Sequence, residues 1–422
     1  MFRHRLLATT AVTALAALGL VAPAHAAAGP LADCLTLSPS TCYAPRQFLT
    51  AYGIQPLLDH GTDGRGETIV MPEFVSTATT PGVTDIRQDL ATFDGLFGLP
   101  SVRLQVITRF GGASTQYLAN GEEAGDVEIA HEVAPAAAIR VILLPETDVI
   151  ANYTEALRFA ASLGSVVSVT AGFGEVCFTS AQVTALNAAL RADLRRHVTV
   201  IASSGDSGAA IVRCSASAEF VKGVNLPASD PLVLSVGGTE LRANHTTGAY
   251  LGETVWNTPP PVLPQGVVAS NGGFSSLFAR PAYQDGVPGI GAMRGVPDVA
   301  ADADPATGMA LAVEIDGGYA ILPGGGTSAG APFWAGIMAL ADQYAGRPLG
   351  FVNPVIYAIG RSRLYHSAFH DITEGNNTVV FPSGTVTGYS ARPGWDPATG
   401  WGSPDAQLLV PLLAQPYHPQ RI

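Results

Sequence analysis

The chain has 422 residues and a formal net charge of −12, from 34 acidic and 22 basic side chains. This acidic balance, without a basic stripe to neutralise phosphates, argues against nucleic acid as a partner. A hydrophobic content of 47% supplies a large core, and 47 glycines and 31 prolines indicate many tight turns. A chain of this length can form one large domain with long loops.

The first 26 residues have the pattern of a secretory signal peptide. Arg3 and Arg5 precede an apolar run, Leu6–Val21, and an A-x-A processing site ends at Ala26. No later stretch reaches the roughly 20 apolar residues that a membrane-spanning helix needs. We therefore expect a secreted protein without membrane contact, in which residues 27–422 form a single domain.

Four cysteines in an exported chain predict disulfide bonds. Three connectivities are possible, and closeness in sequence favours the pairs Cys34–Cys42 and Cys177–Cys214. The alternative is a catalytic cysteine, but no local sequence context here would lower the pKa of a thiol.

Apolar runs alternate with helical patterns through the first half of the chain. Five runs are typical of buried strands, at residues 68–71, 139–144, 166–169, 198–202 and 232–236. Three segments between them have helical spacing, at residues 126–134, 154–163 and 181–194. The alternation predicts an α/β fold with a mostly parallel β-sheet flanked by helices.

Ser328 lies in the small-residue motif G-G-T-S-A-G-A-P, just before an apolar run at 333–341 that predicts a buried helix. A serine at the start of such a helix lies among unpaired N–H donors, which stabilise negative charge that develops on a substrate oxygen. We therefore interpret Ser328 as a candidate nucleophile. The alternative is a threonine-serine pair that only caps the helix.

A hydroxyl nucleophile needs a base, and the histidines offer no good candidate. His60 opens an H-G-T sequence, but it lies in a predicted turn with no helix after it, and no D-[ST]-G follows the strand 68–71. His131 cannot begin a zinc-binding H-E-x-x-H motif, because the position of the second histidine is Pro135. These features argue against a histidine-based triad.

Glu122 and Asp126 form an i, i+4 pair at a predicted helix start. Two like charges at this spacing repel each other unless they share a proton, which raises the pKa of one of them. Such a pair can hold Glu122 ready to accept the Ser328 proton while Asp126 orients it. The alternative is that both acids are there only because they suit the helix dipole.

Asp206 lies in the motif S-S-G-D-S-G, directly after the predicted strand 198–202. At the carboxyl end of a parallel strand it points into the crevice where such sheets bind ligands. A protonated Asp206 can donate a hydrogen bond to an oxyanion. The alternatives are a turn-forming aspartate and a trypsin-like G-D-S-G loop, for which the chain lacks both the histidine context and a β-barrel pattern.

These motifs, in this order, resemble those of the sedolisin family of serine-carboxyl peptidases, which have a subtilisin-like fold. The likeness covers almost the whole mature chain and includes R-G-V-P-D-V-A-A at residues 294–301. The resemblance implies that Ser328 is the nucleophile, Glu122 the base, Asp126 the orienting acid and Asp206 the oxyanion donor.

The same resemblance implies one structural calcium ion in a C-terminal loop region. Two carboxylates, three backbone carbonyls and a water would form the oxygen-only shell that calcium prefers. The matching ligands are Asp371, Ile372, Arg392, Gly394 and Asp396. Arg392 stands where the family usually has a glycine, although only its carbonyl oxygen is needed.

Three further positions bear on the resemblance. Glu73 matches a glutamate that extends the carboxylate network in some family members. The family's S-W-G is T-A-G at residues 170–172, which leaves the substrate-binding wall more open. The long inhibitory segment that usually precedes the catalytic domain has no recognisable counterpart after the signal peptide.

The sequence thus predicts a secreted peptidase that acts on proteins or peptides as a monomer. Activity is expected at acidic pH because Asp206 must stay protonated to donate. The alternative is a catalytically silent, calcium-stabilised binding protein on the same scaffold, against which the four matched catalytic residues argue. A histidine-based subtilisin-like enzyme would instead work at neutral to alkaline pH.

Overall fold

The computed structural model describes residues 42–74, 84–110, 118–119, 121–145, 149–214, 219–258, 268–315 and 318–415. The predicted signal peptide and Cys34 lie outside these residues. The predicted pair of Cys177 and Cys214 is confirmed as a disulfide bond. No helix in the described part of the chain has both the length and the apolar character needed to cross a membrane.

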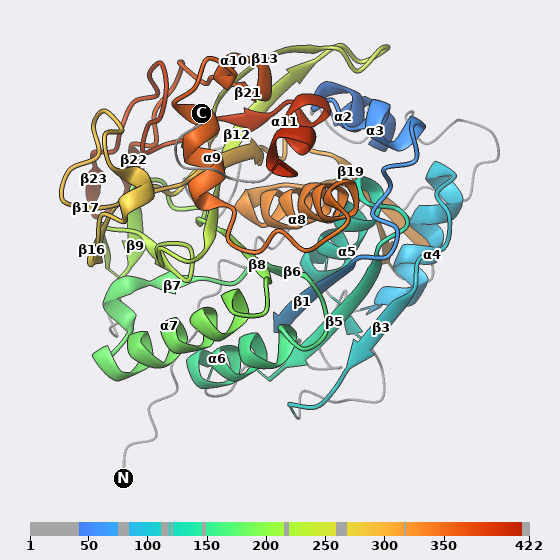
Figure 1. Ribbon diagram of the computed structural model, residues 1–422, viewed down its shortest axis with the longest axis horizontal. Helices are drawn as coiled ribbons and strands as arrows, with labels where there is room; N and C mark the ends of the chain where they lie inside the picture. The colour runs from blue at the N-terminus through green and yellow to red at the C-terminus, as the bar shows by residue number, and fades with distance from the viewer. Residues whose placement is uncertain are drawn as a thin grey trace.

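An eight-stranded sheet forms the centre of the described chain (Figure 1). Its strands pair in the order β13-β12-β8-β6-β1-β5-β3, and β18 pairs with β12. Every pair is parallel except β12 with β13. The strands are β1 (Thr68–Phe74), β3 (Leu104–Ile107), β5 (Ala138–Leu144), β6 (Val166–Val169), β8 (Thr199–Ser203), β12 (Leu234–Ala243), β13 (Tyr250–Val255) and β18 (Val299–Asp302). All five predicted strands are confirmed.

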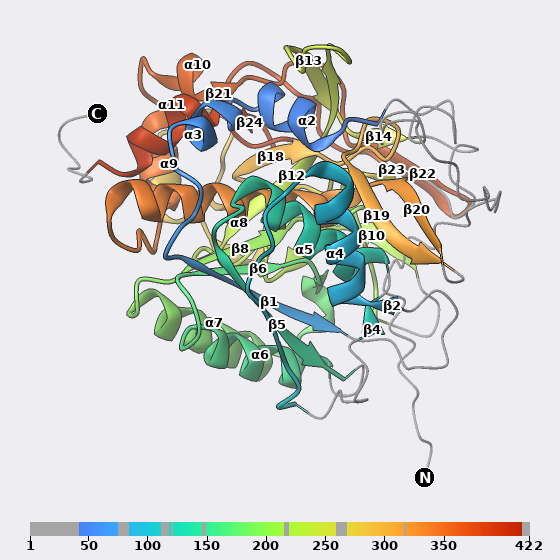
Figure 2. The same ribbon diagram turned by 90° about the vertical axis from the view of Figure 1, so that its right-hand side faces the viewer.

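Helices cover both faces of this sheet. Figures 1 and 2 show α6 and α7 together on one face and α4, α5 and α8 on the other. These helices are α4 (Ile86–Phe97), α5 (Gly121–Val133), α6 (Val149–Ala160), α7 (Ser180–Leu194) and α8 (Gly326–Ala345). The predicted helices are confirmed, although α5 begins earlier than its predicted start and α8 is longer than the apolar run that predicted it.

Successive residues of the central strands point into different layers. In β1, Ile69 and Met71 pack into the core shared with α5 and α8, whereas Val70 packs into the core shared with α6 and α7. Because both faces of a parallel sheet are covered, most strand positions are apolar, and the strands appear in the sequence as mainly apolar runs.

Smaller elements surround this framework. The remaining helices are α2 (Pro45–Ala51), α3 (Gln55–Asp59), α9 (Asn353–Gly360), α10 (Tyr365–Ala368) and α11 (Ala406–Leu413), with single 3-10 turns η1 (Glu175–Cys177) and η2 (Ala282–Gln284). The two-stranded pairs are β2 (Thr84–Asp85) with β4 (Leu118–Ala119), β7 (Phe173–Gly174) with β11 (Asn225–Leu226), β9 (Ala210–Val212) with β10 (Phe220–Lys222), β14 (Asn257–Thr258) with β15 (Val268–Ala269), β16 (Gly273–Ala279) with β17 (Met293–Val296), β19 (Ala310–Ile315) with β20 (Gly318–Pro323), β21 (Phe369–His370) with β24 (Ser403–Pro404), and β22 (Val379–Phe381) with β23 (Gly384–Val386).

Glycine allows α8 to approach α5 closely. A Cβ atom added at Gly336 of α8 would lie 2.4 Å from Val133 Cγ1 of α5. A contact that short is impossible, so any side chain at this position would push the helices apart. The close packing of α5 and α8 therefore depends on a residue without a side chain.

Beyond Asp126, the second half of α5 carries ionisable side chains that are fully buried. Glu128 Oε2 accepts from the backbone N–H of Ala312 in β19 at 2.9 Å. Neither carboxyl oxygen of Glu132 has a hydrogen-bond partner among the described residues. Burial raises the pKa of Glu128 and of Glu132 well above the ordinary range. Both carboxyl groups are therefore protonated, and uncharged, in acidic solution.

His131 and Asp94 make a buried contact between α5 and α4, with Nε2 and Oδ1 3.0 Å apart. Burial lowers the pKa of His131 to about 4 and raises the pKa of Asp94 to about 6. Between these values the aspartate holds the proton and the imidazole is neutral. In this range the contact is between a neutral carboxyl group and a neutral imidazole ring, and is not an ion pair.

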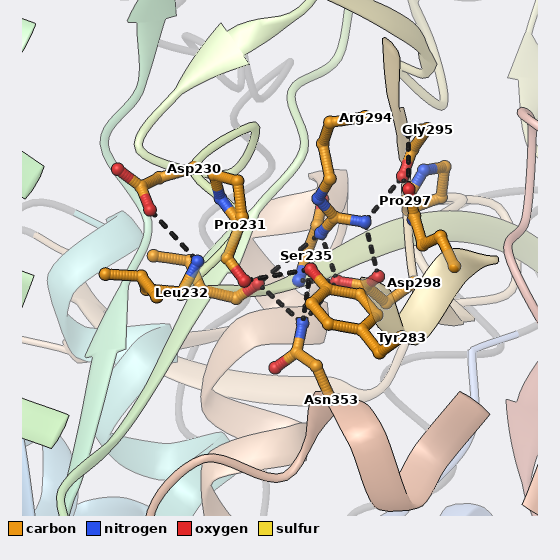
Figure 3. A network of polar contacts seen from close by, with 12 residues as sticks. Asp230, Pro231, Leu232, Ser235, Tyr283, Arg294, Gly295, Pro297, Asp298 and Asn353 are labelled. Atoms are coloured by element: carbon orange, nitrogen blue, oxygen red, sulfur yellow. Dashed lines mark hydrogen bonds and ion pairs between the residues drawn. The ribbon is translucent and has the colours of Figure 1, made fainter. Parts of the chain in front are cut away.

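A buried ion pair in the motif at residues 294–301 joins β12, β17 and α9 (Figure 3). Arg294 Nη1 and Nη2 donate to Asp298 Oδ1 and Oδ2 at 2.7 and 2.6 Å, and neither residue is exposed. Asp298 also accepts from Ser235 N at 2.9 Å, Asn353 Nδ2 at 3.2 Å and Tyr357 Oη at 2.7 Å. This aspartate is thus the common acceptor of donors from three elements, β12, β17 and α9.

We predict that Arg294→Met lowers the free energy of unfolding by about 3–5 kcal/mol, because it leaves the buried charge of Asp298 without its cation. Urea unfolding followed by circular dichroism measures the effect. The matched control is Arg65→Met, which removes an exposed pair with Asp63 and should cost at most about 1 kcal/mol. Equal losses in the two variants would contradict this account of the network.

Candidate active site

Ser328 and Glu122 meet at the N-terminal ends of two helices that pack on the same face of the sheet. Ser328 lies in the first turn of α8, and Glu122 lies in the first turn of α5. The Ser328 hydroxyl donates to Glu122 Oε1 at 2.8 Å, although the residues are 206 positions apart in the chain. The structure therefore brings the predicted nucleophile and the predicted base into direct contact.

The pKa of the Glu122 carboxyl group is raised above its ordinary value. Its side chain keeps solvent contact, but protein atoms crowd the carboxyl group. This desolvation raises the pKa of Glu122, the Ser328 hydroxyl lowers it, and the nearby charge of Asp206 raises it again. A raised pKa makes the carboxylate a stronger proton acceptor than an ordinary glutamate.

Asp126 lies one turn further along α5, is 2% exposed, and pairs with Glu73 of β1. Asp126 Oδ2 and Glu73 Oε1 are buried and have no donor from another described residue. Two adjacent carboxyl groups can satisfy each other only by sharing a proton. Burial and the charge of Glu122 raise the pKa of Asp126, and burial and Asp126 raise that of Glu73.

Asp206 follows the carboxyl end of β8 and is held by the residue before Ser328. Asp206 Oδ1 accepts from both the backbone N–H and the hydroxyl of Thr327, each at 2.8 Å. The Thr327 hydroxyl in turn accepts from Gly205 N at 2.9 Å. Desolvation raises the pKa of Asp206, and the Thr327 bonds lower it. Since Oδ1 receives both donors, Oδ2 is the oxygen that can carry a proton.

The structure thus places all four predicted catalytic residues in one region, from α5, α8 and the loop after β8. It also places Glu73 directly behind Asp126. Sequence reasoning did not single out Thr327 as a partner of Asp206. Its position beside the candidate nucleophile was the only available signal, because the contact joins residues 121 positions apart.

Neither histidine considered in the sequence lies at this site. His60 ends α3, is exposed, and its Nδ1 lies 2.7 Å from the carbonyl oxygen of Pro56. His131 is buried against Asp94. The exclusion of these two histidines as partners of Ser328 agrees with the geometry.

The predicted calcium ligands lie in two neighbouring loops. Both carboxyl oxygens of Asp371 accept from Gly394 N at 3.1 Å, and Asp396 Oδ2 accepts from Arg392 N at 3.2 Å. The carbonyl oxygens of Ile372, Arg392 and Gly394 accept no backbone hydrogen bond from the described residues. Carbonyls without a donor, next to two carboxylates, are the oxygen ligands that suit calcium.

The Arg392 side chain does not compete with a cation at this place. Its Nη2 donates to the carbonyl oxygens of Pro288 and Trp395 at 2.7 and 3.2 Å. Within the described residues it forms no ion pair with Asp371 or Asp396. No three His, Cys, Asp or Glu side chains of these segments gather as metal ligands, so a cation would depend on backbone oxygens.

Known proteins share both sequence and fold with this chain. It is 35% identical over 393 residues to kumamolisin of Bacillus sp. (strain MN-32), and 31% identical over 357 residues to sedolisin of Pseudomonas sp. (strain 101). The chain belongs to the sedolisin family. Tripeptidyl-peptidase 1 of Macaca fascicularis is a further sedolisin-family relative, 28% identical over 361 residues. No protein-family model matches the chain.

The alignments cover 89%, 79% and 78% of this chain in that order. The chain spans 65% of the length of kumamolisin, 57% of sedolisin and 58% of the macaque protein. The structure of Pseudomonas sedolisin, a serine-carboxyl proteinase complexed with two molecules of pseudo-iodotyrostatin, has a TM-score of 0.72 and 27% identity, and covers 88% of this chain and 98% of that chain. This similarity confirms the predicted subtilisin-like α/β fold.

The contact between Thr327 and Asp206 leaves no room for a side chain at Gly326, the first residue of α8. Its φ is +76°, and a Cβ atom there would lie 2.8 Å from Asp206 Oδ2. We predict that Gly326→Ala lowers the free energy of unfolding by more than the roughly 1–2 kcal/mol that backbone strain alone costs. Urea unfolding measures the loss.

The other end of α8 provides the control for this substitution. Gly346 has a φ of +66°, but no atom lies within 4 Å of an added Cβ. Gly346→Ala should therefore lose only the strain energy. If Gly326→Ala cost no more than Gly346→Ala, the proposed steric limit beside Asp206 would be wrong.

Proposed function

We propose that the protein is a secreted serine-carboxyl peptidase that hydrolyses peptide bonds in proteins at acidic pH. The observation that carries this proposal is the 2.8 Å hydrogen bond from the Ser328 hydroxyl to Glu122. The similarity to kumamolisin and to a serine-carboxyl proteinase of known structure supports it. The signal-peptide pattern supports export. Since the four site residues come from one chain, we propose a monomer.

In the proposed acylation step, Ser328 Oγ attacks the carbonyl carbon of the substrate and forms a new C–O bond. Glu122 accepts the hydroxyl proton and then passes it to the leaving amine, so that the C–N bond breaks without releasing an amide anion. Asp126, which shares a proton with Glu73, holds the Glu122 carboxyl in place. A water molecule then attacks the carbonyl carbon of the acyl-enzyme ester, and Glu122 takes a proton from the water. The C–O bond to Ser328 breaks, Glu122 returns the proton to Ser328 Oγ, and the acyl product leaves as a carboxylic acid.

Asp206 would stabilise the oxyanion of both tetrahedral intermediates. Its protonated Oδ2 donates a hydrogen bond to the negative oxygen, while Thr327 holds Oδ1. This role requires the neutral acid. Burial raises the pKa of Asp206, so the acid stays protonated to a higher pH than an ordinary aspartate. The hydrogen bond to the oxyanion is lost as the pH rises through this raised pKa.

The pH profile of the proposed reaction has two limits. On the acidic side, activity rises as the coupled set of Glu122, Asp126 and Glu73 loses a proton and yields a base. On the alkaline side, activity falls as Asp206 ionises and can no longer donate. The result is a bell-shaped profile with its maximum at acidic pH.

We predict that Ser328→Ala and Glu122→Gln each lower kcat/KM by about 10³-fold or more, and that Asp206→Asn lowers it by about 10²–10³-fold. A fluorogenic peptide assay across acidic pH measures each effect. The control is Glu132→Gln, a buried carboxyl on the same helix as Glu122 but outside the site. Maximal wild-type activity above neutral pH, or full activity of Glu122→Gln, would contradict the mechanism.

The proposal includes endopeptidase action. Digestion of a denatured protein in acid, followed by mass spectrometry, separates internal cuts from successive loss of three residues from one end. The second pattern is the activity that the name of the macaque relative describes. Mostly internal products support an endopeptidase, whereas a ladder of tripeptides would overturn this part of the proposal.

We also propose that one calcium ion stabilises the C-terminal loops. It would be held by the carboxylates of Asp371 and Asp396 and by the carbonyl oxygens of Ile372, Arg392 and Gly394. The unpaired carbonyls described above support this assignment. The ion would supply positive charge that joins the two loops, and it takes no part in the bond-breaking steps.

We predict that chelation with EGTA lowers the melting temperature by a few degrees, on the order of 5 °C at saturating calcium. Calcium, but not magnesium, should restore it. Asp371→Asn keeps an acceptor for Gly394 N but removes a charge, so calorimetry should show weaker calcium binding. Identical melting with and without chelator would contradict the assignment.

A further inference from the structure

Thr170 directly follows β6 and carries a hydroxyl group beside the buried acid pair. The residue is 8% exposed. Its Oγ1 donates to Glu73 Oε2 at 3.4 Å, a long hydrogen bond, and the hydroxyl group also lowers the pKa of the adjacent Asp126 carboxyl group. One neutral hydroxyl thus lies beside the coupled carboxyl groups of Glu73 and Asp126.

The backbone of this segment is fixed from two sides. Ser203 Oγ of β8 donates to the carbonyl oxygen of Thr170 at 2.7 Å. Tyr153 Oη of α6 donates to the carbonyl oxygen of Ala171 at 2.9 Å. These bonds come from the strand paired with β6 and from a helix that covers the sheet, so the Thr170 backbone is held beside the acid pair by the fold.

The other groups that act on the pair are acidic or neutral. Burial has the largest effect on the pKa of both Glu73 and Asp126, and the charges of Glu122 and Glu123 of α5 raise both values further. Burial, followed by the charge of Glu73, raises the pKa of Tyr153. Among the described residues, neither acid of the pair joins an ion pair with a cation. A hydroxyl donor is therefore the kind of group left to stabilise a negative charge here.

We infer that Thr170 is a positioning residue whose hydroxyl stabilises negative charge on Asp126 in the acid pair behind Glu122. It touches neither Ser328 nor the reacting atoms in this arrangement. Its effect passes through Asp126 to the base. This inference rests on the proposed function for its kinetic readout, but the charge it assigns to Asp126 can be measured without turnover.

The sign of the effect follows from the hydrogen bond. Donation by Thr170 lowers the pKa of Asp126. Loss of the donor raises it, so the coupled acids keep their first proton to a higher pH. The acidic limit of the activity profile should therefore move upward. The alkaline limit depends on Asp206 and should stay where it is.

The test compares two substitutions that separate shape from hydrogen bonding. Thr170→Val keeps the branched shape and removes the hydroxyl, whereas Thr170→Ser keeps the hydroxyl and removes the methyl group. We expect Thr170→Val to move the acidic midpoint of kcat/KM upward by roughly one pH unit, with the alkaline midpoint unchanged. Thr170→Ser should restore the acidic midpoint.

If Thr170 acted only through packing, Thr170→Val would stay closer to the wild type than Thr170→Ser, because valine fills the site better than serine. The matched control is Thr154→Val, which removes a buried hydroxyl on α6 that donates to Ile150 O, away from the acids. It should leave both midpoints unchanged. If Thr170→Val does not fold, Thr170→Ala also lacks the hydroxyl and should show the same upward shift.

A second measurement needs no substrate. Protein labelled with ¹³C at the aspartate carboxyl carbons is titrated by NMR, and Asp126→Asn identifies the resonance. We expect the Asp126 midpoint to rise in Thr170→Val and to return in Thr170→Ser. If the wild type cleaves no peptide, the proposed function fails while this titration still decides the inference. Unchanged midpoints in Thr170→Val by both methods would overturn the inference.

Discussion

The site depends on how closely α5 and α8 pack on one face of the sheet. The Ser328 hydroxyl reaches the Glu122 carboxyl at 2.8 Å because the first turns of these helices lie side by side. The spacing is set deeper in the core, where Gly336 lets α8 approach Val133 without a side chain between them. Two residues far apart in sequence therefore meet through helix packing, and a larger residue at position 336 would separate them without touching either one.

Within that frame, hydroxyl groups take the place of cations as partners of the buried acids. Thr327 gives two hydrogen bonds to Asp206, and Thr170 reaches the pair formed by Asp126 and Glu73. A neutral donor stabilises a carboxylate less than an arginine would, so these acids keep raised pKa values. Raised values suit both tasks assigned here, since one acid must donate and another must accept protons in acidic solution.

Much of this arrangement was predictable from the sequence. Parallel strands covered on both faces appear as apolar runs, and the four site residues lie in motifs with a known order. The apolar runs underestimate the length of a strand that contains glycine. The predicted strand ended at residue 236, but β12 continues through Gly237 and Gly238, because Gly238 packs against Trp256 and Ala303 and does not form a turn. The roles of Thr170 and Thr327 could not be predicted, since a hydroxyl group has no periodic pattern and its partners lie on other elements.

The uncharged acids of α5 also affect how the chain folds. Glu128 and Glu132 are buried in the native state with pKa values well above those of an exposed glutamate. At a pH between the unfolded and the folded pKa values, the native state holds these protons and the unfolded chain does not, so folding takes protons up from the solvent. By linkage, this part of the stability is complete below the unfolded pKa and is lost as the pH rises through the folded values. Through these two groups, acidification favours the native state, independently of any reaction at Ser328.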